Sequence, residues 1–112
     1  MIWLIGHKGM LGSEIAKQLT QHKIPWIGTS SEVDITNYQT LESFEKTLET
    51  SAYYPSSLPH AQRKVQWIIN CAGYTNVDEA ETDIDTCNKL NIIGAQNIAR
   101  LCRNIGCKLI HI

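Results

Sequence analysis

The stretch Gly6-His7-Lys8-Gly9-Met10-Leu11-Gly12 decides the fold of this chain, because it joins an apolar run to a helical pattern. Residues 2–5, directly before it, are all apolar, as is typical of a strand covered on both faces in a parallel sheet. After it, Leu11, Ile15 and Leu19 recur every four residues and indicate the buried face of a helix. The chain is therefore expected to begin with a strand, a glycine turn and a helix.

Apolar runs and helical patterns alternate along the rest of the chain. Further strands are expected over residues 24–28, 65–69 and 108–112. Thr36 and Gln39 have the form of a capping box that opens the second helix. The resulting order β-α-β-α-β-α-β is typical of a parallel sheet with right-handed crossovers. We therefore predict the α/β class, with a Rossmann-like doubly wound parallel sheet of which this chain forms the N-terminal portion.

The third helix is expected to be long, from Thr82 to a C-terminal cap at Gly106. Asn91 is unusual because it falls on the apolar face, where an amide needs hydrogen-bond partners such as the backbone of neighbouring strand ends. Gly94, one turn further on, indicates a close contact with the sheet. The inner face of this helix would carry Ile84, Cys87, Asn91, Gly94, Ile98 and Leu101.

Composition excludes several classes of partner. The 112 residues are 43% hydrophobic and 19% charged, with a formal net charge of −1 and no long basic run, which argues against binding to nucleic acid. No apolar run approaches the roughly 20 residues of a membrane span, and the N-terminus lacks a signal-peptide pattern. A cytoplasmic location is the resulting expectation. The four cysteines form no CxxC pair and have no His at ligand spacing, so buried thiols are expected and no metal site.

The glycine turn is the strongest candidate for a binding site. The spacing GxxGxxG between a strand and a helix suits a tight turn, close approach of a pyrophosphate, and close packing of the helix on the strand. Free N–H groups at the helix start would face the phosphates, with Lys8 as a cation at the turn and His7 as a further contact. A plain turn with a packing contact is the alternative interpretation.

The end of the second strand is expected to meet the ribose beside adenine. An acidic residue there would favour NAD, whereas this sequence has Thr29-Ser30-Ser31-Glu32. Hydroxyl groups such as that of Ser30 can bond a 2′-hydroxyl or a 2′-phosphate, and no Arg is present to pair with the phosphate. The preference between NADP and NAD stays open, with a slight lean to NADP or dual use. Asp34 and Ile35 follow where side chains could meet the adenine edge, although Asp34 could equally be a turn residue.

The segment Asn70-Cys71-Ala72-Gly73-Tyr74 leaves the third strand. Its small residues would let the backbone approach a ligand, because ligands in open α/β sheets lie outside the carboxyl ends of the strands. A simple strand-ending turn is the alternative. The acidic residues from Asp78 to Asp85 are interpreted as a solvated helix start rather than as paired catalytic carboxylates. His22, His60 and His111 have no visible partner and are assigned no role.

Several segments together resemble the dTDP-4-dehydrorhamnose reductases, a family of extended short-chain dehydrogenases. The resemblance lies in residues 6–14, 33–36, 69–81, 91–99 and 108–112. It implies hydride transfer from NADPH or NADH to the C4 keto group of a dTDP-sugar, giving dTDP-L-rhamnose. By position it implies a dinucleotide site formed by Gly6, His7, Lys8, Gly9, Met10, Leu11, Gly12, Ser30, Asp34, Ile35, Cys71, Ala72, Gly73, Tyr74 and Asn91. The sugar-nucleotide entrance would be bordered by Thr75, Val77 and Asp78.

The family's catalytic residues do not occur in this chain. Its catalytic Ser/Thr and its Tyr-x-x-x-Lys pair would lie beyond the strand over 108–112, and no Tyr-x-x-x-Lys is present. We therefore expect residues 1–112 to be an incomplete NAD(P)-binding Rossmann domain that is inactive alone. Two alternatives are an NADP-binding regulatory subunit without catalysis and a nucleotide-sugar epimerase or dehydratase. The open sheet edge predicts association, of which a homodimer is one form.

Overall fold

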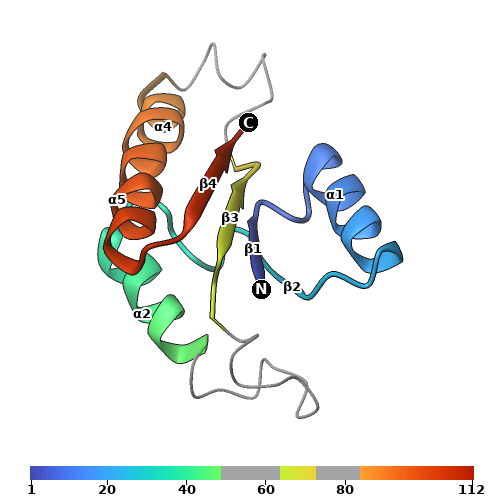
Figure 1. Cartoon of the computed structure of the whole chain (residues 1–112). Coiled ribbons are helices and arrows are strands. Elements are labelled where there is room, and N and C mark those ends of the chain that lie inside the picture. Colours follow the sequence, from blue (N-terminus) through green and yellow to red (C-terminus); the bar gives the residue numbers. More distant parts are fainter. Residues whose placement is uncertain (49–63, 73–83) are drawn as a thin grey trace.

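Four parallel strands form the centre of the molecule (Figure 1). The structure, a computed structural model, describes residues 1–48, 64–72 and 84–112. The strands β1 (Ile2–Ile5), β2 (Trp26–Thr29), β3 (Trp67–Asn70) and β4 (Lys108–His111) pair in the order β2-β1-β3-β4. The register pairs the last residue of β1 with the last residues of β2 and β3, and the last residue of β3 with that of β4. All four strands therefore end at one edge of the sheet.

Helices lie on both faces of this sheet. Helix α1 (Met10–Gln21) lies on one side, whereas α2 (Tyr38–Leu48) and α5 (Ala95–Ile105) lie together on the other (Figure 1). A short helix α4 (Ile84–Asn88) and a π-helical segment η2 (Lys89–Gly94) run directly into α5. This arrangement confirms the predicted α/β, Rossmann-like fold. No helix in the described ranges has the length and apolarity that a membrane crossing requires.

The main core lies between the sheet and the pair α2 and α5. Trp3 is fully buried, with its ring centroid 5.0 Å from that of Phe44 on α2. Its indole Nε1–H donates to the Thr29 hydroxyl at 2.9 Å, so the one polar atom of the side chain is satisfied. Leucines and isoleucines of both helices fill the rest, each worth about 1.5–3 kcal/mol when fully buried. The central ones are Leu41, Leu48, Ile98 and Leu101.

Two strands begin later than predicted. The second strand starts at Trp26 rather than at residue 24, because Pro25 has no N–H for the ladder and contributes only its carbonyl, which accepts from Ile2 N–H at 3.0 Å. The third covers Trp67–Asn70 rather than 65–69. Its predicted first residue, Val65, is buried but lies outside the strand. The fourth strand, predicted over 108–112, is confirmed except for its last residue.

The start of α2 is capped by a different residue from the one predicted. Asn37, not Thr36, precedes the first helical residue, and its Oδ1 accepts from Gln39 N–H at 3.0 Å. The backbone N–H and hydroxyl of Thr36 both donate to Asp34 Oδ1, at 2.9 and 2.6 Å. The predicted capping box is therefore wrong, and Asp34 takes part in the turn that was its alternative interpretation.

The buried face of the third helix is shorter than predicted. Gly94, Ile98 and Leu101 are buried, but Ile84 is 63% exposed and Asn91 is also exposed. The wider turn of η2 shifts the helical phase between these two groups, so one continuous face cannot form. The C-terminal cap at Gly106 is confirmed, since this residue has φ 75° and its N–H donates to the Cys102 carbonyl at 2.9 Å.

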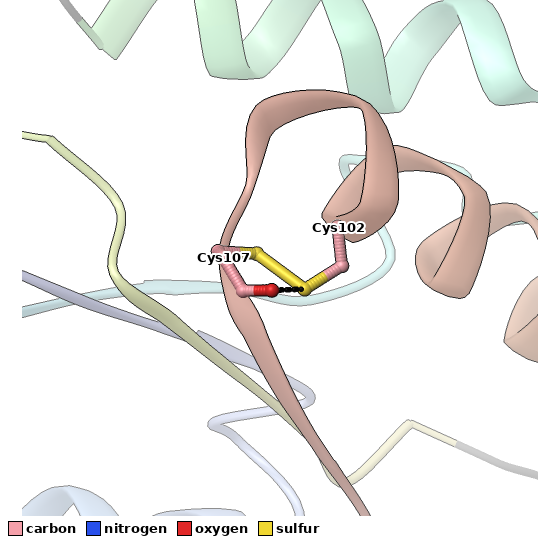
Figure 2. The surroundings of a disulfide bond; sticks show 2 residues. All are labelled: Cys102 and Cys107. Atoms are coloured by element: carbon pink, nitrogen blue, oxygen red, sulfur yellow. Dashed lines mark hydrogen bonds between the residues drawn. A yellow bond between two sulfur atoms is a disulfide. The ribbon is translucent and has the colours of Figure 1, made fainter.

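Two cysteines are joined rather than free. The structure links Cys102, in the last turn of α5, to Cys107 as a disulfide (Figure 2). The left-handed turn at Gly106 brings their Cα atoms to 5.0 Å, within the usual range for a disulfide. Cys102 Sγ also lies 2.7 Å from the Cys107 carbonyl oxygen, the acceptor available to the reduced thiol. The prediction of thiols is wrong for this pair, whereas Cys71 and Cys87 are free.

Candidate functional site

A cavity of about 1050 Å³ lies along the edge where the strands end. It extends from the end of β2, past the glycine turn after β1 and the end of β3, to the end of β4. A site at this edge agrees with the general rule for ligands of open parallel sheets. Its lining is Ile5, Gly6, Gly9, Met10, Leu11, Gly12, Glu14, Ser30, Ser31, Val33, Asp34, Ile35, Cys71, Ala72, Leu90, Asn91, His111 and Ile112.

The three glycines of the turn meet different surroundings. Gly6 has φ 83°, and a Cβ there would lie 2.8 Å from Ala72 N, so this position needs glycine for both conformation and space. A Cβ on Gly12 would overlap the Gly6 carbonyl oxygen, which explains how closely α1 packs on the turn. A Cβ on Gly9 would make only an ordinary contact, 3.5 Å from that same oxygen. Gly9 therefore faces open space in the cavity.

The first turn of α1 supplies hydrogen-bond donors to this space. Gly9 is the N-cap residue, and no side chain caps the helix. The first intrahelical bond runs from Ser13 N–H to the Gly9 carbonyl at 2.8 Å, which leaves the N–H groups of Met10, Leu11 and Gly12 outside the helical ladder. All three residues line the cavity. Together with the positive end of the helix dipole, they form a site suited to an anion.

Leu11 does not lie in the core, where the helical pattern placed it. Its side chain is 47% exposed, and Met10 is 94% exposed, although both line the cavity. The buried face of α1 is formed by Gly12 and Leu19. The first turn of α1 projects beyond the sheet edge, so its apolar side chains form a wall of the cavity instead of part of the core.

His7 and Lys8 lie outside the cavity lining. The His7 ring covers Gly28 of β2, where a Cβ would come within 2.5 Å of it, and its centroid is 6.1 Å from that of Trp26. Its Nδ1 is buried without a hydrogen-bond partner in the described residues. The structure thus places the imidazole against β2, and contact of His7 or Lys8 with a phosphate stays a prediction.

The end of β2 carries a fixed carboxylate. Ser30 and Ser31 line the cavity, and Ser30 N–H donates to Glu32 Oε1 at 2.9 Å. Partial burial raises the pKa of the Glu32 carboxyl. The backbone hydrogen bonds and the charges of Lys8 and His7 outweigh this effect, so the pKa is lowered overall. A negative charge therefore lies beside the serines at neutral pH.

The segment after β2 is held by the third helix. Ile35 lines the cavity next to Asp34, and its carbonyl accepts from Asn97 Nδ2 at 3.0 Å. Gly94 lies against the Ile35 side chain, since a Cβ on this glycine would come within 2.5 Å of Ile35 Cδ1. Gly94 was predicted to contact the sheet, but its close contact is with this segment, which lies outside the strands. Asn97, which the sequence did not single out, fixes the position of the wall.

The ends of β3 and β4 are joined by polar side chains. Asn70 is 1% exposed, and its Oδ1 accepts from Ala72 N–H at 2.9 Å. Its Nδ2 lies 3.0 Å from His111 Nδ1. Cys71, Ala72 and His111 line the cavity, and burial raises the pKa of the Cys71 thiol, which keeps it protonated. The sequence offered one signal for the pair of Asn70 and His111, namely an amide at the end of an apolar strand.

Asn91 lines the cavity from η2. Its Nδ2 donates to Cys87 Sγ at 3.1 Å, within the helix, and the residue is exposed. The predicted bonds to strand-end backbone stay a prediction. Leu90, its neighbour, adds an apolar wall. Of the remaining predicted site residues, Gly73, Tyr74, Thr75, Val77 and Asp78 lie outside the described residues.

The described lining combines backbone donors, hydroxyls and apolar surface. Donors cluster at the glycine turn, polar groups at the β2 end, and apolar surface at Ile35, Leu90 and Ile112. In ranges 1–48, 64–72 and 84–112 no three metal-ligating side chains come together. The arrangement suits a long ligand with a central anionic group.

Comparisons with known proteins show similarity to several dTDP-4-dehydrorhamnose reductases. The chain is 31% identical over 110 residues to a dTDP-4-dehydrorhamnose reductase of Mycobacterium tuberculosis, matching 97% of this chain and 31% of that protein. A crystal structure of a reductase ortholog from Clostridium acetobutylicum has a TM-score of 0.75 at 31% identity, over 96% of this chain and 34% of that one. The Bacillus anthracis reductase in complex with NADP also has a TM-score of 0.75, at 27% identity and the same coverage.

The chain spans about a third of the length of these relatives. One family model matches the whole of this chain. The model of the RmlD substrate binding domain covers residues 1–112, and the chain therefore belongs to that family.

Proposed function

We propose that this chain binds a nicotinamide dinucleotide, NADP or NAD, along the carboxyl edge of its sheet. The observation that carries the proposal is the glycine turn, where Gly6 and Gly12 admit no Cβ and Gly9 opens into the cavity. Helix-start N–H groups beside Gly9 would bind the pyrophosphate. The adenosine half would lie toward Ser30 and Asp34 at the end of β2, and the nicotinamide half toward the ends of β3 and β4.

The proposed activity of the protein is that of its named relatives. They are dTDP-4-dehydrorhamnose reductases, one of them crystallised with NADP. On this basis the dinucleotide would supply a hydride for the C4 keto group of a dTDP-sugar. Residues 1–112 would form the cofactor-binding part, with the proton donor and the substrate-binding part elsewhere, since no Tyr-x-x-x-Lys occurs here. The chain alone would then bind cofactor without catalysing reduction.

Fluorescence titration with NADPH and NADH tests the proposal, with Gly9→Asp and Gly9→Asn as a matched pair. Gly9 has φ −72° and open space around its Cβ position, so both side chains fit the backbone. Asn measures the steric effect, and the difference between the two isolates the charge. A carboxylate about 4 Å from a phosphate costs about 4 kcal/mol at an effective dielectric constant of 20. The affinity of the Asp variant should be at least 100-fold below that of the Asn variant.

Two results would contradict the proposal. One is a folded wild-type chain that binds neither nucleotide. The other is equal binding by the Asp and Asn variants, which would place the phosphates away from Gly9. Circular dichroism of each variant establishes that the fold is intact before the affinities are compared.

A further inference from the structure

The hydrogen bonds of Asn70 determine the orientation of its side-chain amide. Ala72 N–H can only donate, so the atom facing it at 2.9 Å must be Oδ1. The amide nitrogen Nδ2 therefore faces His111 Nδ1 at 3.0 Å. Because Asn70 is 1% exposed, solvent does not compete for this arrangement. The β3 strand end thus presents a donor to the His111 ring.

This donor selects one form of the His111 imidazole. Nδ2 carries only hydrogens, so Nδ1 must accept with its lone pair, and the proton of the neutral ring lies on Nε2. His111 lines the cavity, and its Nε2 makes no hydrogen bond within the described residues. The ring therefore carries a donor on the edge opposite Asn70.

We infer that His111 is a cofactor-contacting residue, whose Nε2–H donates to an oxygen of the nicotinamide half of the dinucleotide, and that Asn70 positions it. The inference rests on the proposed function, in which the nicotinamide half lies toward β4. An oxygen acceptor such as a ribose hydroxyl or the carboxamide carbonyl matches this donor. Asn70 acts through His111 because its own polar atoms are used by Ala72 and by the ring.

The chain contains an internal control for the ring form. His22 Nδ1 lies 2.8 Å from the carbonyl oxygen of Gln18, which can only accept. His22 must therefore carry its proton on Nδ1, the opposite tautomer from His111. Long-range ¹H–¹⁵N NMR spectra of the wild-type chain above pH 8 distinguish the two. Opposite tautomers are expected, and a proton on His111 Nδ1 would overturn the inference.

Binding measurements test the contact itself. Relative to wild type, His111→Phe should weaken NADPH binding about three- to tenfold, the value of one hydrogen bond, and His111→Gln, which keeps a donor, should recover part of it. The second probe, adenosine 2′,5′-bisphosphate, lacks the nicotinamide half and should bind equally to wild type and His111→Phe. His22→Phe is the matched control and should change neither affinity.

The outcomes separate this inference from the proposed function. If adenosine 2′,5′-bisphosphate binds and NADPH affinity is unchanged in His111→Phe, the inference is wrong while dinucleotide binding stands. If His111→Phe weakens both probes equally, His111 acts on the fold rather than on the nicotinamide half, and the inference is again wrong. If neither probe binds the folded wild-type chain, both proposals are overturned.

Discussion

Replacing Gly12 by alanine tests the close packing of α1 against the glycine turn. The new Cβ would overlap the Gly6 carbonyl oxygen and would also lie 2.8 Å from the Gly6 carbonyl carbon. These are backbone atoms, so the turn or the helix must move, at a cost of about 3 kcal/mol or slightly more. Alanine favours a helix over glycine by about 1 kcal/mol, which offsets part of this cost. The net expectation is a loss of about 2 kcal/mol in the free energy of unfolding.

Gly9→Ala is the matched variant, three residues away in the same turn. Its Cβ would be 3.5 Å from the Gly6 carbonyl oxygen, an ordinary contact, and φ −72° suits alanine. The free energy of unfolding should therefore change by less than about 1 kcal/mol. Urea unfolding without nucleotide measures both variants, because a bound ligand would add its own stabilisation. Equal stability of the Gly12 and Gly9 variants would refute the account of the turn.

Three further predictions concern other parts of the structure. Asn97→Ala removes the bond to the Ile35 carbonyl and should weaken NADPH binding three- to tenfold. Asn104→Ala removes a bond from the same helix to the Tyr38 hydroxyl and should leave NADPH binding unchanged. Titration of both variants with NADPH compares them. Glu32→Gln removes a negative charge from the end of β2. The ratio of NADPH affinity to NADH affinity should therefore rise about two- to threefold. An unchanged ratio would place the 2′-phosphate elsewhere. Reduction of the Cys102–Cys107 disulfide should lower the free energy of unfolding by about 2 kcal/mol. Dithiothreitol should therefore lower the urea midpoint of the wild-type chain. In Cys102→Ser the midpoint should not depend on dithiothreitol.

The fold was predictable because its signals are local and repeated. Each strand is a short apolar run, and Gly6, Gly12 and Gly106 stand where the backbone needs a residue without a Cβ or with positive φ. The positive φ at Gly6 and Gly106 and the contact of Gly12 with Gly6 act within a few residues, so the sequence can show them, whereas the limit that Ala72 sets at Gly6 depends on the fold. The strand boundaries were predicted less accurately, also for a local reason, because Pro25 moves the start of β2 to Trp26.

The site was predictable only in part, because several of its residues act through distant partners. The amide of Asn70 is informative only once His111, in another strand, lies beside it. Asn97 likewise bonds a carbonyl 62 residues away. The π-helical turn of η2 departs from the 3.6-residue period of an α-helix, so the exposure of Asn91 could not be derived from α-helical spacing. The disulfide depends on the chain reversal at Gly106.

In the proposed complex, a dinucleotide lies along the carboxyl edge of the sheet with its pyrophosphate at the start of α1. The most direct measurement is a ¹H–¹⁵N correlation spectrum of the chain titrated with NADPH. We expect saturable shifts, largest for the backbone N–H groups of Met10, Leu11 and Gly12, with smaller ones at Ser30 and with the far end of α5 unchanged. Saturation that leaves the amides of Met10, Leu11 and Gly12 unshifted would contradict it.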